Sequence, residues 1–314
     1  MVALFTAPQH VPTREQRLEI LTRCNVADLL SGLRVEEPGL LRSALAMLGR
    51  LPARGFARAL QEYDDLVGEA GMVAGADLLV RSFTRSVTVS GQERVPPRGP
   101  VLVVANHPGL VDAMALVVAL QSRPDLRIVA ADRDLLRAVP HVSSRLLYVH
   151  PERGGRSGLV RDVVGHLSDG GAVLTFPAGR IEPDPALDDA AAAAALAAWT
   201  DSTAMFLRRV PDTLVLPAAV AGVVSRRAFD HPLAKRLPGS DDRDRAAATL
   251  QVLWPPYRDT HTTVRIGRAL SSGRSGRSHL VEAMTHLLRP VATDDAAPPP
   301  QAAEPARSSA RQDA

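Results

Sequence analysis

A histidine and an aspartate stand five residues apart in a segment whose pattern suits proton transfer. The segment VLVVANHPGLVD covers residues 101–112, and His107 and Asp112 are its titratable side chains. If Asp112 lies about one helical turn beyond the histidine, its carboxylate fixes the imidazole tautomer and stabilises the protonated form. His107 would then be a general base toward a hydroxyl. Asn106 is a candidate substrate-binding residue that would orient the loop or donate a hydrogen bond. The same spacing also suits a loop histidine that a nearby aspartate caps.

A second segment, FPAGR, occupies residues 176–180 at the end of an apolar run. Gly179 permits a close approach of the backbone to a ligand, and the N–H groups beside it can face an anion. Arg180 can hold a phosphate through two parallel hydrogen bonds. The candidate binding residues of this segment are Phe176, Pro177, Gly179 and Arg180. Taken alone, the segment is also an ordinary turn after a strand.

Both segments follow short, continuously apolar runs, which are typical of strands buried on both faces. Strand-like and helix-like stretches alternate from residue 86 onward. This alternation predicts an α/β fold, with a mostly parallel mixed sheet flanked by helices. Such sheets place ligand-handling residues at the carboxyl ends of their strands. The expected strands are residues 86–91, 101–105, 126–131, 145–149, 172–176, 213–220 and 262–266, and the expected helices are 108–121, 157–168, 190–209 and 279–288.

The sequence of the first part of the chain, residues 13–80, predicts helices and no strands. Residues 13–80 show no alternation of β-branched residues, and Thr13 with Gln16 makes a capping box before an apolar run. Pro38 and Pro52 interrupt the stretch, so three or four short helices are expected. We divide the chain into a helical N-terminal region at 1–85, an α/β domain at 86–290 and a disordered tail at 291–314.

Composition excludes several classes of protein. Of the 314 residues 46% are hydrophobic, which suits a buried core and excludes a wholly disordered chain. The single cysteine, Cys24, excludes an internal disulfide and a thiolate metal cluster. The 37 basic residues include one lysine, Lys235, and this arginine bias is typical of a GC-rich bacterial genome. A net charge of +3 does not argue for nucleic acid. No apolar run reaches the roughly 20 residues that span a bilayer, which leaves peripheral membrane contact open.

In this order and spacing the segments resemble the glycerolipid acyltransferases, the bacterial and plastid enzymes that acylate glycerol 3-phosphate or lysophosphatidate. VTVSGQERVPPRGPVLVVANHPGLVD, from Val87, is similar to the family's entry strand, turn and first motif, NHxxxxD. His107 and Asp112 fall on the family's catalytic pair. LLYVHPERGG (146–155) lies where the second motif does, and Arg153 matches the arginine that contacts acceptor phosphate. FPAGR and TLVLPAAV are similar to the third and fourth motifs.

The chain departs from the family pattern at three places. Ala178 stands where the third motif usually has a glutamate, and Arg180 comes one position earlier than the commonest arginine. His150, Pro151 and Glu152 replace the usual residues before Arg153. These departures concern the acceptor and leave the proposed base unchanged.

The resemblance implies an O-acyltransferase of phospholipid biosynthesis. The acyl group would pass from acyl-CoA or acyl carrier protein to a hydroxyl of glycerol 3-phosphate, lysophosphatidate or a related lysolipid. Arg153 and Arg180 would anchor the acceptor phosphate, and N–H groups near Phe176–Gly179 would stabilise the oxyanion. No cofactor, metal or nucleic acid is expected, and the protein would work in the cytoplasm at the inner face of the cell membrane. A lipid-binding or lysolipid-hydrolysing protein on the same scaffold is the alternative.

Overall fold

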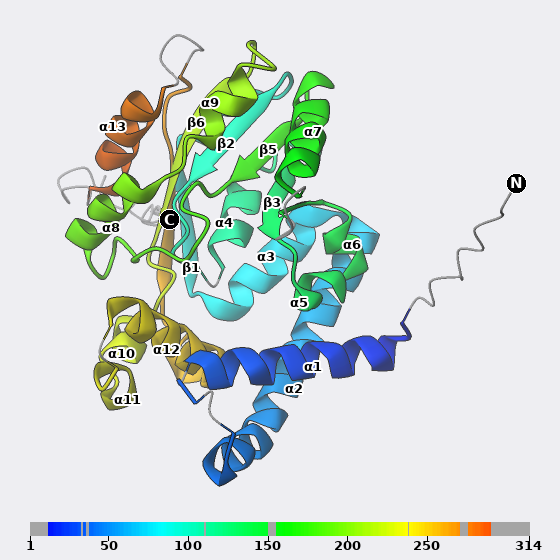
Figure 1. The fold of residues 1–314 in the computed structure, drawn as a ribbon, viewed down its shortest axis with the longest axis vertical. Helices are drawn as coiled ribbons and strands as arrows, with labels where there is room; N and C mark the ends of the chain where they lie inside the picture. Colours follow the sequence, from blue (N-terminus) through cyan, green and yellow to red (C-terminus); the bar gives the residue numbers. More distant parts are fainter. Residues whose placement is uncertain are drawn as a thin grey trace, which may run out of the picture.

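A computed structural model describes residues 12–32, 34–35, 38–109, 111–149, 155–237, 239–270 and 276–289 (Figure 1). The strands are β1 (Ser86–Ser90), β2 (Val101–Ala105), β3 (Arg127–Ala131), β4 (Leu146–Val149), β5 (Ala172–Thr175), β6 (Leu214–Ala221) and β7 (His261–Ile266). They form one sheet in the order β1-β7-β6-β2-β5-β3-β4. Neighbours are parallel except β6 and β7, which are antiparallel. The expected mostly parallel mixed sheet is confirmed.

Helices flank this sheet and also form the N-terminal region. They are α1 (Arg14–Gly32), α2 (Leu40–Ala70), α3 (Met72–Phe83), α4 (Asp112–Ala119), α5 (Asp134–Arg137), α6 (Pro140–Ser143), α7 (Gly155–Ser168), α8 (Asp189–Ala195), α9 (Ser202–Leu207), α10 (Arg226–Phe229), α11 (Pro232–Lys235), α12 (Ser240–Leu253) and α13 (Arg277–Leu288). The expected helix 108–121 begins four residues late, at Asp112, and the expected helix 190–209 is divided between α8, a 3₁₀ turn and α9.

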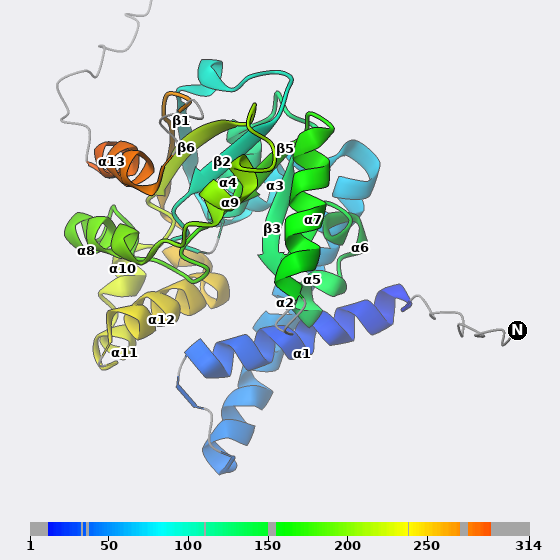
Figure 2. The same cartoon turned by 45° about the horizontal axis from the view of Figure 1, so that its top comes forward.

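The sheet separates two apolar cores, because successive side chains of a strand point to opposite faces. Val101, Val103 and Ala105 of β2 belong to the core that contains α2, α3 and α4. Leu102 and Val104 belong to the core that contains α7, α8, α9 and α13. Figures 1 and 2 show α3 and α4 on one side of the sheet and α7, α9 and α13 on the other. All five residues of β2 are therefore buried, as its uninterrupted apolar sequence predicts.

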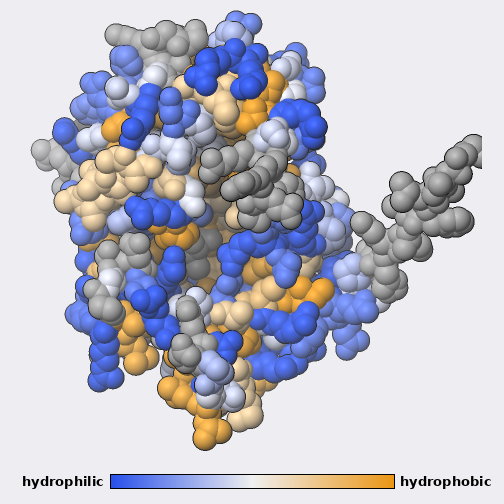
Figure 3. All heavy atoms as spheres, viewed as in Figure 1, coloured by the Kyte–Doolittle hydropathy of each residue, from blue (hydrophilic) through white to orange (hydrophobic). Residues whose placement is uncertain are grey.

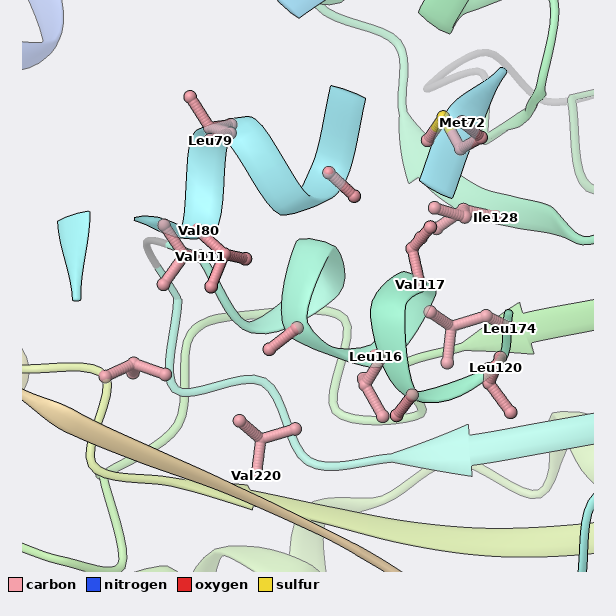
Figure 4. Packing of buried hydrophobic residues seen from close by; sticks show 14 of the residues in the cluster. Met72, Leu79, Val80, Val111, Leu116, Val117, Leu120, Ile128, Leu174 and Val220 are labelled. Carbon is pink, nitrogen blue, oxygen red and sulfur yellow. The ribbon is translucent and has the colours of Figure 1, made fainter. Parts of the chain in front are cut away.

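Helix α4 is fixed between a second helix and the sheet. Figure 4 shows it packed beneath α3, with Leu116 and Leu120 on the side that faces the strands. These leucines and Leu79 and Val80 of α3 belong to one buried cluster. Because α4 begins at Asp112, this packing also fixes the position of that carboxylate.

The N-terminal region differs from expectation in the length of its second helix. Thr13 and Gln16 do form the capping box: each backbone N–H donates to the other's side chain, over N···O distances of 2.8 and 3.2 Å. However, α2 runs for 31 residues with Pro52 inside it, so the expectation that this proline ends a short helix was wrong. Ala53, Ala57 and Leu60 are buried just beyond the proline. Their packing against the rest of the protein outweighs one missing hydrogen bond.

Residues of α1, α2 and α3 share a core with the sheet, through Leu21, Leu60 and Phe83 among others. The division of the chain at residues 85 and 86 stays a prediction. The tail expected at 291–314 lies outside the described residues. Within the described ranges, the protein contains no helix with the length and apolar character needed to span a membrane.

Candidate active site

The candidate site lies at the carboxyl ends of two neighbouring parallel strands. His107 comes two residues after β2 and Phe176 directly after β5, and these strands pair in the middle of the sheet. Gly109 has a φ of 89°, in the left-handed region that glycine adopts without strain. The turn at Gly109 leads the chain from the strand into α4. The strands point toward the side of the molecule where α1 and α12 lie (Figures 1 and 2).

The structure brings the predicted pair together. Nδ1 of His107 lies 2.7 Å from Oδ2 of Asp112, whose side chain is almost fully buried. The N–H of Gly109 also donates to Oδ2, at 2.8 Å, and the N–H of Ala113 donates to Oδ1. As the first residue of α4, Asp112 lies at the positive end of the helix dipole. The Asp112 carboxylate accepts hydrogen bonds from these donors, so Nδ1 of His107 must donate to it and carries the ring proton. Nε2 of His107 is then the nitrogen that can accept a proton from a substrate.

Opposing effects set the pKa of His107. Burial alone would lower the pKa, because it disfavours the charged ring. The Asp112 carboxylate opposes this through its charge and its hydrogen bond, and the charge of Glu182 adds to it. The net effect raises the pKa of His107 above its ordinary value of 6.5. The ring is therefore a stronger base than a free imidazole, as proton abstraction from a hydroxyl requires.

A second buried carboxylate, Glu182, holds the backbone of the histidine. Its Oε2 accepts the N–H of His107 at 2.8 Å, and its own N–H donates to the His107 carbonyl at 2.8 Å. Its Oε1 accepts the indole N–H of Trp199 at 2.7 Å. Burial raises the pKa of Glu182, whereas these hydrogen bonds and His107 lower it. Sequence reasoning missed this residue, although the lost glutamate at Ala178 was a signal to search for a carboxylate nearby.

A third buried carboxylate, Asp184, anchors the same loop to the end of β6. It accepts the backbone N–H groups of Ala186, Gly222, Val223 and Val224 at 2.7–3.0 Å. Burial raises its pKa, against the lowering effect of these four donors. The loop after β5 is thus fastened both to His107 and to β6.

In the FPAGR segment, Phe176 contacts His107, whereas Pro177 and Gly179 form hydrogen bonds with other parts of the chain. The ring of Phe176 stacks on that of His107, with centroids 4.4 Å apart and planes 26° from parallel. The Pro177 carbonyl accepts the N–H and hydroxyl of Thr200. The Gly179 N–H donates to the Phe176 carbonyl at 3.0 Å, so it is engaged in a turn and does not face an oxyanion.

Of the remaining predicted residues, Asn106 is buried, Arg180 is exposed and Arg153 lies outside the described residues. Asn106 is buried, and its amide donates to the Val220 carbonyl and accepts the Val220 N–H, both at 2.8 Å. This matches the loop-orienting role rather than a contact with substrate. Arg180 is exposed beside Ile181 and Glu182. Arg153 and its neighbour His150 lie outside the described residues. The roles of Arg180 and Arg153 toward phosphate stay predictions.

Comparisons with known proteins locate a family in this part of the chain. A family model described as "Acyltransferase" matches residues 86–221, which include His107, Asp112 and Glu182. No curated protein matches. Among solved structures, the 1-acyl-sn-glycerophosphate (LPA) acyltransferase PlsC of Thermotoga maritima is similar with a TM-score of 0.42 and 15% identity, covering 87% of this chain and 92% of that one. On the strength of the family match, residues 86–221 are an acyltransferase domain, and the chain that carries them is an acyltransferase.

Proposed function

We propose that this acyltransferase moves a fatty acyl group from a thioester to a hydroxyl of a glycerolipid acceptor. The donor is acyl-CoA or acyl carrier protein, and the acceptor is glycerol 3-phosphate, lysophosphatidate or a related lysolipid. The observation that carries the proposal is the His107–Asp112 pair, held at 2.7 Å at the end of a central strand. It lies inside the region that matches the acyltransferase family.

The geometry supports a direct transfer. Nε2 of His107 removes the proton of the acceptor hydroxyl as its oxygen attacks the thioester carbonyl carbon. The new C–O bond forms, and the carbonyl oxygen carries the negative charge. When this intermediate collapses, the C–S bond breaks and the thiolate takes the proton from the imidazolium. Asp112 stabilises the imidazolium while it exists and keeps the ring oriented.

A cavity with apolar and polar walls beside the loop of His107 supports a lipid substrate with a polar end. The cavity has a volume of about 560 Å³ and lies between α1, α2, α5, α12 and the loop that carries Ile181. One of its walls is Ile181, whose Cδ1 lies 3.0 Å from where a side chain at Gly109 would begin. The cavity therefore approaches the loop of the base, and its size is within the usual range for ligand pockets. Its apolar lining is Leu29, Ala53, Phe56, Leu135, Ile181, Ala248, Val252 and Leu253.

The proposal extends to the place of the reaction. The acyl donors are water-soluble, whereas lysophosphatidate and the lysolipids reside in or near a bilayer and acylated glycerol 3-phosphate enters one, so we place the enzyme in the cytoplasm, at the inner face of the cell membrane. Arg180, exposed on the loop after β5, and Arg153 are the proposed anchors of the acceptor phosphate.

An acceptor screen tests the function. The purified protein is incubated with long-chain acyl-CoA or acyl carrier protein and with glycerol 3-phosphate or a panel of lysophospholipids. We expect free thiol and acylated acceptor in equal amounts, and none with His107→Ala. Free fatty acid without acylated acceptor would instead identify a hydrolase. Equal turnover by His107→Ala and the unmodified protein would refute the mechanism.

A further inference from the structure

The cavity beside the loop of His107 has a polar wall that the proposed reaction has not yet used. The surface over α1 and α12 shows hydrophilic and hydrophobic residues next to one another (Figure 3). A ligand of this cavity needs a polar group that satisfies the polar wall, because buried polar side chains without a partner are costly. The residues of the polar wall are Asn25, Asp28, Ser31, Arg133, Arg245 and Thr249.

The charged residues of the polar wall do not cancel. Arg133, directly before α5, pairs with Asp28 of α1 at 2.7 Å. Arg245 is exposed on α12 and forms no ion pair or side-chain hydrogen bond in the part of the chain that the structure describes. Asp242, about one turn before it, pairs with Arg34 at 3.4 Å. The polar wall therefore carries one uncompensated positive charge, and a free guanidinium suits a phosphate or a carboxylate.

Two hydroxyl groups lie near this guanidinium. Thr249 is one helical turn beyond Arg245, on the same face of α12. Ser31 precedes Gly32, where α1 meets α12: a side chain at Gly32 would meet the Thr249 hydroxyl and would begin 3.6 Å from the Arg245 carbonyl oxygen. Neither hydroxyl takes part in a hydrogen bond with another described residue. One guanidinium and two hydroxyls are therefore available to an anion with several oxygens.

The polar wall lies on the same side of the molecule as the base. The parallel strands point toward α1 and α12 (Figures 1 and 2), and His107 follows one of these strand ends. The cavity also reaches the loop after β5 through Ile181, and the next residue, Glu182, accepts the N–H of His107. A ligand held by Arg245 would therefore share one cavity with the loop that positions the base.

We propose that Arg245 binds the phosphate group of the acceptor, with Ser31 and Thr249 as further donors. This inference rests on the proposed function and deepens it, because it makes a phosphate-bearing acceptor the preferred substrate over an uncharged one. Arg245 lies outside residues 86–221, so this anchor is separate from the part of the chain that matches the family. Coenzyme A also carries phosphate, but its diphosphate and third phosphate would need more positive charge than one free guanidinium supplies.

Binding measured without a donor tests the proposal. The full-length protein is titrated in a calorimeter with glycerol 3-phosphate, short-chain lysophosphatidate, a monoacylglycerol of the same chain length, and coenzyme A. We expect Arg245→Gln to weaken binding of the phosphate-bearing acceptor at least tenfold and to leave binding of monoacylglycerol and coenzyme A unchanged. Arg245→Lys keeps the charge and should have an intermediate affinity. Because no acyl group is transferred, this binding does not depend on the proposed reaction.

Arg208→Gln is the matched control. Arg208 is an exposed arginine directly after α9, on the other side of the sheet, and it has no ion pair among the described residues. This variant should bind every ligand normally. Both arginines are exposed, so urea unfolding of either variant should match that of the unmodified protein.

Steady-state kinetics assigns the effect to one substrate. In Arg245→Gln we expect KM for the phosphate-bearing acceptor to rise at least tenfold, with KM for acyl-CoA unchanged. Equal affinity of Arg245→Gln and the unmodified protein for both phosphate-bearing acceptors would overturn the proposal, as would a failure of the unmodified protein to bind either of them. Loss of coenzyme A binding with acceptor binding retained would also overturn it and assign the guanidinium to the donor.

Discussion

The loops around His107 and the outer side of α2 depart in opposite ways from the usual distribution of polar and apolar residues. The α2 outer face is the set of five exposed residues Leu40, Leu41, Met47, Leu48 and Leu51. Around His107, the carboxylates of Asp112, Glu182 and Asp184 are buried. On α2, leucines are exposed, and Arg50 and Arg54 beside them pair with Glu19 of α1. Polar groups are usually exposed and large apolar side chains usually buried, so a buried charge or an exposed apolar patch often indicates a functional site.

The two regions also differ in how they are held. Each buried carboxylate is fixed by two or more hydrogen bonds, so the position of the base is determined by the protein alone. The side chains of the outer face, in contrast, are between 66% and 93% exposed. Substitutions around His107 should therefore alter activity, and substitutions of the buried carboxylates should also alter stability, whereas substitutions on the outer face should leave both nearly unchanged. The following predictions test this contrast, from the largest expected effect to the smallest.

His107→Ala should remove the base. We expect kcat/KM to fall by about 10²–10⁴-fold, the range for loss of a general base. The melting temperature should change little. His279→Ala, an exposed histidine on α13, is the control and should keep full activity. Steady-state kinetics with the best acceptor checks the prediction, and a loss of less than tenfold would contradict it.

Asp112→Asn should shift the pH profile. A base works when it is deprotonated, so kcat/KM of the unmodified enzyme should rise with pH through the raised pKa of His107. The Asp112 carboxylate contributes to that raised value. Without its charge the pKa falls, and the acid limb of the profile should move to lower pH while the maximum rate decreases. An unchanged acid limb would show that another group controls it.

Glu182→Ala should weaken both stability and activity. The N–H of His107 and the indole N–H of Trp199 would lose their acceptor, at a cost of about 1–3 kcal/mol for each buried donor. Glu182→Gln keeps one carbonyl oxygen and should have an intermediate effect. Urea unfolding measures the stability. Because Glu182 also raises the pKa of His107, both variants should move the acid limb to lower pH, which a purely structural role would not do.

Ala248→Phe should narrow the cavity between α12 and the N-terminal helices. Ala248 lines this cavity and is half-buried, so the new ring can enter it without displacing the sheet. We expect kcat/KM to fall about tenfold for long acyl chains, corresponding to roughly 1.4 kcal/mol, and to be unchanged for short ones. Competition between acyl donors of different length measures this ratio. An equal loss for all lengths would place the acyl chain elsewhere.

The double variant Leu48→Gln/Leu51→Gln should have the smallest effect on the protein itself. Both leucines are largely exposed, and such substitutions usually change the free energy of unfolding by less than about 0.5 kcal/mol. Urea unfolding should therefore match that of the unmodified protein. A large loss of stability would show that these leucines pack against the protein.

Local patterns predicted the part of the site that is local in sequence. His107 and Asp112 are five residues apart across one strand–helix junction, so spacing and an apolar strand were enough to place them together. Glu182 lies 75 residues from His107 in the sequence. A local sequence pattern predicts neither this long-range contact nor the burial of the glutamate. The expected helix end at Pro52 was wrong because that prediction used only the neighbouring sequence. The packing that keeps α2 helical on both sides of Pro52 involves other elements of the fold. Arg180 has the residue type that the function needs, but residue type alone does not show that an exposed side chain reaches a ligand.

The unbroken course of α2 also has a mechanical consequence. At 1.5 Å per residue its 31 residues form a rod about 46 Å long. One end carries the outer face, and toward the other end the Tyr63 hydroxyl meets the sulfur of Met114 on α4, 2.9 Å away. The rod therefore joins the projecting tip to the helix that begins with Asp112. The number of residues in α2 therefore sets the distance between this projecting end and the helix that carries Asp112.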